Sequence, residues 1–226
     1  MPEVSSSLLW SIAIVAFYLG FIIFLSDLGR RFSTDAEITR KVVHIGTGNV
    51  ILLAWWLNIP AWVGITAAVV AAIVAIISYF VPILPSINSV GRTSLGTFFY
   101  AVSMGVLVAV FWPLSMPWYA AIGILTMALG DGMAALVGQN FGRHPYTMWG
   151  NKKSFEGSLT MAGVSFLVTG FILLFVTGNS LSIWVIALIV AIVATLLETV
   201  SKLGVDNLTV PLGSAAIAFY LSQYWL

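Results

Sequence analysis

Charge is concentrated in one stretch of this chain, GDGMAALVGQNFGRHPYTMWGNKKSFEGSLTMAG (residues 130–163), and the sequence on either side of it is mostly apolar. Asp131 lies near the end of one hydrophobic run, and Glu156 opens the next. The polar loop between them carries Arg143, Lys152 and Lys153. A short charged loop between two apolar runs is typical of consecutive membrane helices.

The composition of the whole chain also indicates a membrane protein. Of 226 residues, 60% are hydrophobic and 8% are charged, which is far from the composition of soluble domains. A helix needs roughly 20 apolar residues to cross a bilayer core, and continuously apolar runs exclude a β-barrel. We therefore expect an all-α, polytopic helical membrane protein forming a single domain, residues 1–226. The sequence predicts about eight transmembrane helices, at residues 8–27, 42–57, 60–80, 94–112, 118–138, 157–177, 182–200 and 208–225.

The second and last runs are short and contain glycine, so each is a candidate for a tilted, broken or re-entrant path. If all eight runs cross, the nine basic residues fall on one side, which the positive-inside rule makes cytoplasmic, with both termini on the other side. No long basic face exists for a nucleic acid. The chain has no cysteine and therefore no disulfide or thiolate metal site.

The first cluster of interest is TRKVVHIGTGN (residues 39–49), in which Arg40 and His44 share a helix face and Lys41 lies three residues before His44. Snorkelling to the lipid headgroups accounts for the two cations. It does not account for a histidine one turn inside an apolar run, which is either a functional group or a hydrogen-bonded core residue. Further on lies the stretch NSVGRTSLGTFFY (residues 88–100), whose serine and threonine residues are explained by helix capping. The alternative is a functional role, in which Arg92 contacts a phosphate.

Asp131 is a carboxylate inside an apolar run, and such acids are functional by default. A metal or proton-transfer role is favoured over a structural salt bridge. Lys152 and Lys153 precede the next helix, where cations are unfavourable unless an anion binds. With the Ser154 and Ser158 hydroxyls, they form a candidate polyphosphate cradle. Membrane anchoring is the alternative for these lysines, but the adjacent Glu156 makes the cluster more specific than anchoring requires.

A last cluster, ETVSKLGVDN (residues 198–207), allows an ion pair between Glu198 and Lys202 one helical turn apart. Asp206 and Asn207 either cap the final helix or contribute to a metal site. Magnesium is held in proteins by one or two carboxylates together with substrate phosphates. The clusters together predict phosphoryl or nucleotidyl transfer to a membrane-embedded alcohol, at a cytoplasmic rim where three distant segments converge. Neither a Walker A motif nor a protein-kinase glycine loop is present.

Four motifs in this order resemble the CTP-dependent polyprenol and lipid kinases, which include phytol kinase, dolichol kinase and a CTP-using diacylglycerol kinase. The motifs are RKVVH (residues 40–44), GDGMAALVGQNFG (130–142), KKSFEGS (152–158) and ETVSKLGVDNLTVP (198–211). The chain looks most like the phytol kinase branch and is distantly similar to phosphatidate cytidylyltransferases. The resemblance implies transfer of the γ-phosphoryl group of CTP to phytol with Mg²⁺, yielding phytyl monophosphate and CDP for tocopherol-type lipids.

The resemblance also implies roles for individual residues. Asp131, Glu198 and Asp206 are the expected metal ligands, and Asp131, His44 and Lys41 the expected catalytic residues, with His44 or Asp131 accepting the alcohol proton. The expected nucleotide-binding residues are Arg40, Arg143, Lys152, Lys153, Ser154, Ser158 and Lys202. Glu156, Gly157 and Asn207 are further positions of the family motifs. The partners are CTP, membrane lipids and a prenyl or other lipid alcohol, with no nucleic acid.

Several readings stay open at this point. The physics of the sequence does not separate phytol from farnesol, dolichol or diacylglycerol as the acceptor. A cytidylyltransferase making a CDP-lipid would use the same phosphate cradle. A proton- or ion-coupled transporter using Asp131 and His44 is a rival from another class, although no inverted repeat is visible.

Overall fold

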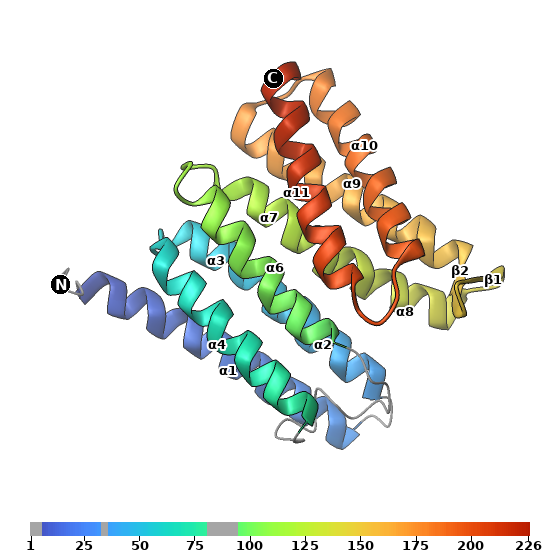
Figure 1. Cartoon of the computed structure of the whole chain (residues 1–226), viewed down its shortest axis with the longest axis horizontal. Helices are drawn as coiled ribbons and strands as arrows, with labels where there is room; N and C mark the ends of the chain where they lie inside the picture. The colour runs from blue at the N-terminus through green and yellow to red at the C-terminus, as the bar shows by residue number, and fades with distance from the viewer. Residues whose placement is uncertain (1–5, 33–35, 81–94) are drawn as a thin grey trace.

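The computed structural model describes residues 6–32, 36–80 and 95–226, and these form an all-α bundle with one small hairpin (Figure 1). The helices are α1 (Ser6–Phe32), α2 (Ala36–Gly48), α3 (Val50–Trp56), α4 (Ala61–Phe80), α6 (Gly96–Phe111), α7 (Pro117–Leu125), the π-helical turn η1 (Thr126–Asp131), α8 (Gly132–Phe141), α9 (Phe155–Thr177), α10 (Leu181–Val200) and α11 (Asp206–Trp225). Two strands, β1 (Pro145–Met148) and β2 (Asn151–Ser154), form the hairpin between α8 and α9.

The predicted helical membrane class is confirmed, and each of the eight apolar runs coincides with helical structure. Five stretches are long and apolar enough to cross a membrane: Ser6–Gly29, Ala61–Ser78, Pro117–Phe141, Phe155–Thr177 and Leu181–Val200. The protein is therefore a multi-pass membrane protein. The apolar helix α6 is shorter, and neither α2–α3 nor α11 meets the same requirement, so the count of eight crossings stays a prediction.

The second predicted span is broken, as its glycines suggested. Helix α2 ends at Gly48 and α3 begins at Val50. Near the break, the Thr47 hydroxyl donates to the carbonyl of Val43, and the Asn49 side chain donates to that of Ile45. Such side-chain bonds compete with the helical ladder and bend helices.

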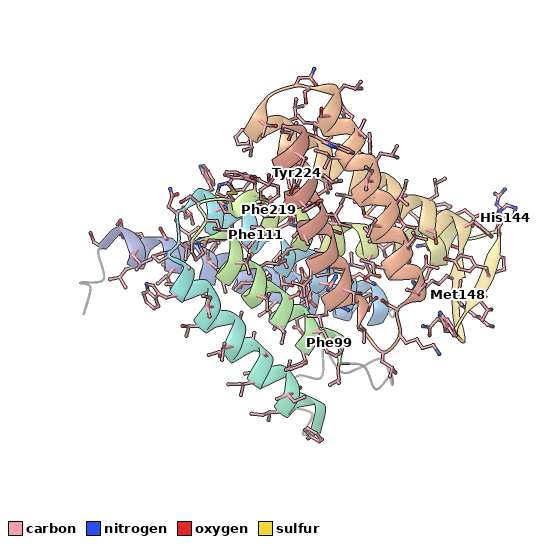
Figure 2. The ribbon with its side chains drawn as sticks, turned by 45° about the horizontal axis from the view of Figure 1, so that its top comes forward. Phe99, Phe111, His144, Met148, Phe219 and Tyr224 are labelled. Carbon is pink, nitrogen blue, oxygen red and sulfur yellow. The ribbon has the colours of Figure 1, made fainter. Side chains whose placement is uncertain are left out.

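The stretch α7–η1–α8 is the centre of the bundle. In its most apolar 18-residue stretch, 67% of the residues are buried, compared with 6% in the corresponding stretch of α1, which faces outward. Helices α2, α6, α9 and α11 pack around this stretch. On its α6 and α11 side, Phe111 and Phe219 lie 5.6 Å apart between ring centroids (Figure 2). Asp131, at the end of η1, is thereby placed on the most buried element of the protein.

The two ends of the bundle differ in charge. The lower right of Figure 1 holds the start of α2, the end of α8, the hairpin and the α10–α11 connection, and we call this end the charged rim. The opposite rim holds the turns at residues 57–60, 112–116 and 178–180, which contain no charged residue. Arg92 lies outside the described residues, as do the side chains of Arg30, Arg31 and Arg40.

We predict that cysteines introduced at the two rims are labelled from opposite sides of the membrane. Thr147 lies on β1 and Asn179 follows α9, so the 23 residues of α9, about 35 Å of helix, separate them. In this cysteine-free chain, an impermeant maleimide should reach Asn179→Cys from outside and Thr147→Cys only after the cytoplasmic face is opened. Labelling of both from one side would contradict the topology.

Candidate active site at the charged rim

A buried ion pair joins the first and third sequence clusters. The Lys41 ammonium on α2 donates to Asp131 Oδ2 at 2.5 Å, and Lys41 is only 4% exposed. His44 Nε2 lies 3.9 Å from the same carboxylate oxygen. The snorkelling interpretation is therefore wrong for Lys41, because its charge lies in the protein interior and is neutralised by Asp131.

Two glycines allow α2 to come this close to the central helix. A Cβ at Gly48 would overlap Ala128 of η1 and lie 2.5 Å from the Tyr100 hydroxyl oxygen. A Cβ at Gly132 would lie 2.6 Å from Cγ1 of Ile45. The π-helical turn η1 ends at Asp131, and single π-turns of this kind are frequent at functional sites.

Tyr100 is a member of this site that the sequence did not single out. Its ring centroid lies 4.5 Å from that of His44, and its hydroxyl donates to the His44 carbonyl at 3.5 Å. In the sequence, Tyr100 resembles its aromatic neighbours Phe98 and Phe99, and only the packing of α6 against α2 distinguishes it.

The polar loop of the opening stretch is an antiparallel hairpin that projects beyond the helix ends, where Figure 2 shows His144 and Met148. Its register pairs Tyr146 with Lys153 and Thr147 with Lys152. Because successive residues of a strand point to opposite faces, Lys152 and Lys153 do not act as the adjacent pair at a helix start that the sequence predicted.

The two lysines have different surroundings. Lys153 reaches across to α10, where its ammonium pairs with the Glu198 carboxylate and donates to the Glu198 carbonyl at 2.5 Å. Lys152 is exposed on the other face of the hairpin. The predicted pair of Glu198 with Lys202 is wrong, because α10 ends at Val200 and Lys202 is no longer on the helix.

Residues of one hairpin face contact the α10–α11 connection in succession. Asn151 donates from its side chain to the Ser201 carbonyl at 3.2 Å, and the Lys202 ammonium lies 5.5 Å from the centroid of the Trp149 ring. Trp149 has φ 51° and is followed by Gly150 at φ 86°. The left-handed conformation costs a bulky residue roughly 1–2 kcal/mol, and an exposed cation–π contact returns only about 0.5–1 kcal/mol.

The base of the hairpin is held by residues that the sequence assigned to nucleotide binding or to the family motifs. The Ser154 hydroxyl caps α9 by accepting from the Gly157 amide at 3.1 Å, and Ser158 lies 2.6 Å from the Tyr146 hydroxyl. Glu156 Oε1 lies 2.6 Å from His144 Nδ1 rather than beside the lysines. These contacts give Ser154, Glu156 and Ser158 structural roles in positioning Lys153.

Asp206 is the third acidic residue predicted for the site, after Asp131 and Glu198. It is the first residue of α11 and lies before the predicted span 208–225. Val205 occupies the N-cap position of α11, so the N-cap alternative for Asp206 and Asn207 is wrong. The Asn207 amide donates to Asp206 at 3.3 Å. Burial and the charge of Asp131 raise the pKa of Asp206 to about 6, while Lys153 and Lys41 oppose this shift. The charges that shift this pKa come from residues of the other two segments, so Asp206 lies within electrostatic range of both ion pairs.

The cluster therefore holds three carboxylates and two ammonium groups, which gives one excess negative charge. Within residues 6–32, 36–80 and 95–226, no three acidic, histidine or cysteine side chains stand close enough to form a metal cage. Magnesium does not need one, since one or two carboxylates and substrate phosphates suffice. The carboxylate oxygens of Asp131 and Asp206 are donors of the kind that magnesium prefers, and a divalent cation would favour their ionised forms.

Arg143 is the remaining predicted residue whose side chain the structure describes. Arg143 is exposed between α8 and the hairpin.

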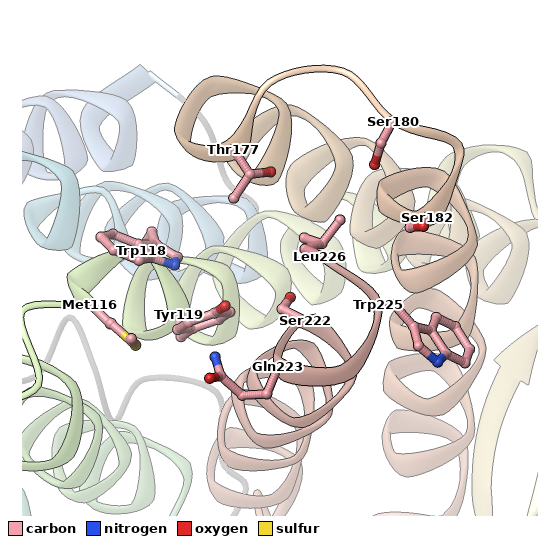
Figure 3. Close-up of a pocket in the computed structure, with 10 residues that line it drawn as sticks. All are labelled: Met116, Trp118, Tyr119, Thr177, Ser180, Ser182, Ser222, Gln223, Trp225 and Leu226. Carbon is pink, nitrogen blue, oxygen red and sulfur yellow. The ribbon is translucent and has the colours of Figure 1, made fainter.

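A hollow of about 430 Å³ lies at the opposite rim, among the start of α7, the α9–α10 turn and the end of α11 (Figure 3). Its lining includes Trp118, Ser182 and Gln223 and has no charged side chain. This hollow is therefore unsuited to phosphate and remote from the cluster.

Comparison with known proteins identifies relatives over nearly the full chain. A phytol kinase of Synechocystis sp. is 54% identical over 96% of this chain and 94% of its own length. A chloroplastic farnesol kinase of Arabidopsis thaliana is 31% identical over 92% of this chain and 73% of its own. A probable chloroplastic phytol kinase 2 of rice is 31% identical over 87% of this chain and 70% of its own. No family profile and no solved structure matches.

We predict that Gly48→Ala destabilises the fold and Gly163→Ala does not. The first substitution forces α2 away from η1, at a cost of about 1–3 kcal/mol. Nothing lies within 4 Å of a Cβ at Gly163, where the helix should gain about 0.5–1 kcal/mol. Thermal unfolding in detergent measures both, and equal midpoints would refute the close approach of α2.

Proposed function

This chain belongs to the family of phytol and farnesol kinases, and we propose that it transfers the γ-phosphoryl group of CTP to phytol with the help of Mg²⁺. The family resemblance drawn from the motifs is confirmed, and the chain is a phosphotransferase with a prenyl alcohol as acceptor. The observation that supports the rest of the proposal is the cluster of Lys41, Asp131, Lys153, Glu198 and Asp206 at the end of an apolar bundle.

In the proposed reaction, the prenyl hydroxyl oxygen bonds to the γ-phosphorus and the bond from that phosphorus to CDP breaks. The charge on the transferring group is stabilised by preorganised cations, which is the main contribution a protein makes to phosphoryl transfer. Lys41 and Lys153 are held ready for this by Asp131 and Glu198. Arg40, Arg143, Lys152 and Lys202 extend the basic surroundings of the triphosphate.

Asp131 and Asp206 would hold the magnesium ion, with Glu198 beside them. When bound, Mg²⁺ neutralises phosphate oxygens and orients them for transfer. The chain's own contribution is to pack η1, which ends at Asp131, against α11, which begins at Asp206. The excess negative charge of the cluster makes that place attractive to a cation.

We assign the hydroxyl proton to His44. The Asp131 carboxylate already accepts a hydrogen bond from the Lys41 ammonium. His44 Nε2 faces the same carboxylate at 3.9 Å, and packing against Tyr100 restricts the imidazole. Asp131 is the alternative acceptor if it does not bind the metal.

The lipid substrate is proposed to approach from the bilayer, with its tail against the apolar helices and its hydroxyl at the charged rim. That rim is cytoplasmic in this proposal, because all nine basic residues are assigned to it. The whole chain then acts as one catalytic domain.

The decisive test is incubation of the purified protein with radiolabelled CTP, Mg²⁺ and separate samples of phytol, farnesol, dolichol and diacylglycerol. We expect labelled phytyl monophosphate from γ-labelled CTP, with CDP as co-product and the highest kcat/KM for phytol. Pyrophosphate and a CDP-lipid would instead identify a cytidylyltransferase. Transfer from ATP but not CTP would overturn the choice of donor.

We predict that Asp131→Asn and Asp206→Asn each lower kcat by roughly 100-fold or more, as expected when charge stabilisation is lost. Asp131→Asn leaves the buried Lys41 without its counter-charge, so folding must be checked by gel filtration. Asp206→Asn removes no lysine pair, and its defect should include a higher Mg²⁺ requirement. Asp27→Asn, on the exposed α1, is the matched control. Full turnover of the Asp206 variant would remove that residue from the site.

A further inference from the structure

Trp149 is the residue whose placement the proposed reaction leaves unexplained. It occupies the first position of a two-residue hairpin turn in the left-handed conformation, at φ 51°, where asparagine, aspartate or glycine is favoured. Its side chain is 65% exposed and fills no core. The contact with Lys202 does not offset the backbone strain at Trp149. Contacts within the protein therefore do not explain the tryptophan, which indicates that its indole ring binds another molecule.

The surroundings of Trp149 relate it to the proposed phosphate site. Along one face of the hairpin, Trp149, Asn151 and Lys153 meet Lys202, Ser201 and Glu198 in that order. Trp149 lies in the turn, and two strand rises, about 7 Å, separate Asn151 from Lys153. The aromatic ring and Lys153 thus lie toward opposite ends of one hairpin face, as the base and the phosphates do in an extended nucleoside triphosphate.

We propose that Trp149 is the stacking platform for the base of the donor nucleotide, with the triphosphate running along the hairpin toward Lys153; this rests on the proposed function. The indole presents a π-face on which any nucleobase stacks. Lys202 lies over the ring and Lys153 follows on the same face of the hairpin, so the ligand here is an aromatic group attached to an anion.

An exposed tryptophan at a membrane-protein rim is also typical of an interfacial anchor. The chain offers an internal control for this alternative. Leu203 lies at φ 56°, is followed by Gly204 at φ 85° and is 71% exposed, so it repeats the geometry of Trp149 on the adjacent connection without an aromatic ring. An anchoring role predicts similar effects at both residues, whereas stacking predicts an effect at Trp149 alone.

The test uses the full-length protein in detergent and compares Trp149→Asn, Trp149→Phe and Leu203→Asn. Asparagine suits the left-handed turn, so Trp149→Asn should fold at least as stably as the wild type. We expect it to raise the KM for CTP about tenfold or more, in the range of lost base stacking. Trp149→Phe should recover most of the affinity, and Leu203→Asn should not change it.

Direct binding separates this proposal from the proposed function. Equilibrium binding of CTP and of inorganic triphosphate is measured for each variant, without turnover. The wild type should prefer CTP, and Trp149→Asn should bind both ligands alike. An unchanged preference in Trp149→Asn, or a raised KM for the prenol in both Trp149→Asn and Leu203→Asn with CTP affinity intact, would overturn the stacking role. Absence of phosphoryl transfer in the wild type would instead count against the proposed function.

Discussion

The structure depends on the requirement that charge inside an apolar protein be paired. The Lys41 side chain is only 6% exposed and that of Asp131 16%, and an unpaired ion buried there would cost several kcal/mol. Their pairing requires α2 to lie against η1, and the glycines at positions 48 and 132 make that approach sterically possible. The same requirement holds Lys153 to Glu198 and so ties the hairpin to α10. Two ion pairs thus determine how segments distant in sequence meet.

Hydrogen bonds at the base of the hairpin support the ion pair between Lys153 and Glu198. The contacts of Ser154, Glu156 and Ser158 hold the hairpin against α9, so that Lys153 points to Glu198. An isolated two-stranded hairpin is marginal in water, and here it is held by side chains of α9 and α10. Residues of the family motifs therefore divide into those that form the charged cluster and those that hold its supporting hairpin.

Much of the fold was predictable from the sequence because long apolar runs have one stable form in a bilayer, the helix. The break after Gly48 was foreseeable from its glycines. The details of the site were not. Lys152 and Lys153 are equivalent in the sequence, and only strand alternation separates them. The partner of Glu198 was misassigned because helical spacing was applied beyond the predicted end of the run at residue 200, while the true partner, Lys153, is distant in the sequence. Tyr100 was missed because its role arises from tertiary packing alone.

The uncharged turns of the opposite rim have a consequence for biogenesis. Pairs of helices such as α9 and α10 are joined there by a short connection with no lysine, arginine, aspartate or glutamate. Moving such a connection across a bilayer requires no ion to be transferred through hydrocarbon. Each pair can therefore enter the membrane as a helical hairpin during synthesis, with its charged ends kept together at the charged rim.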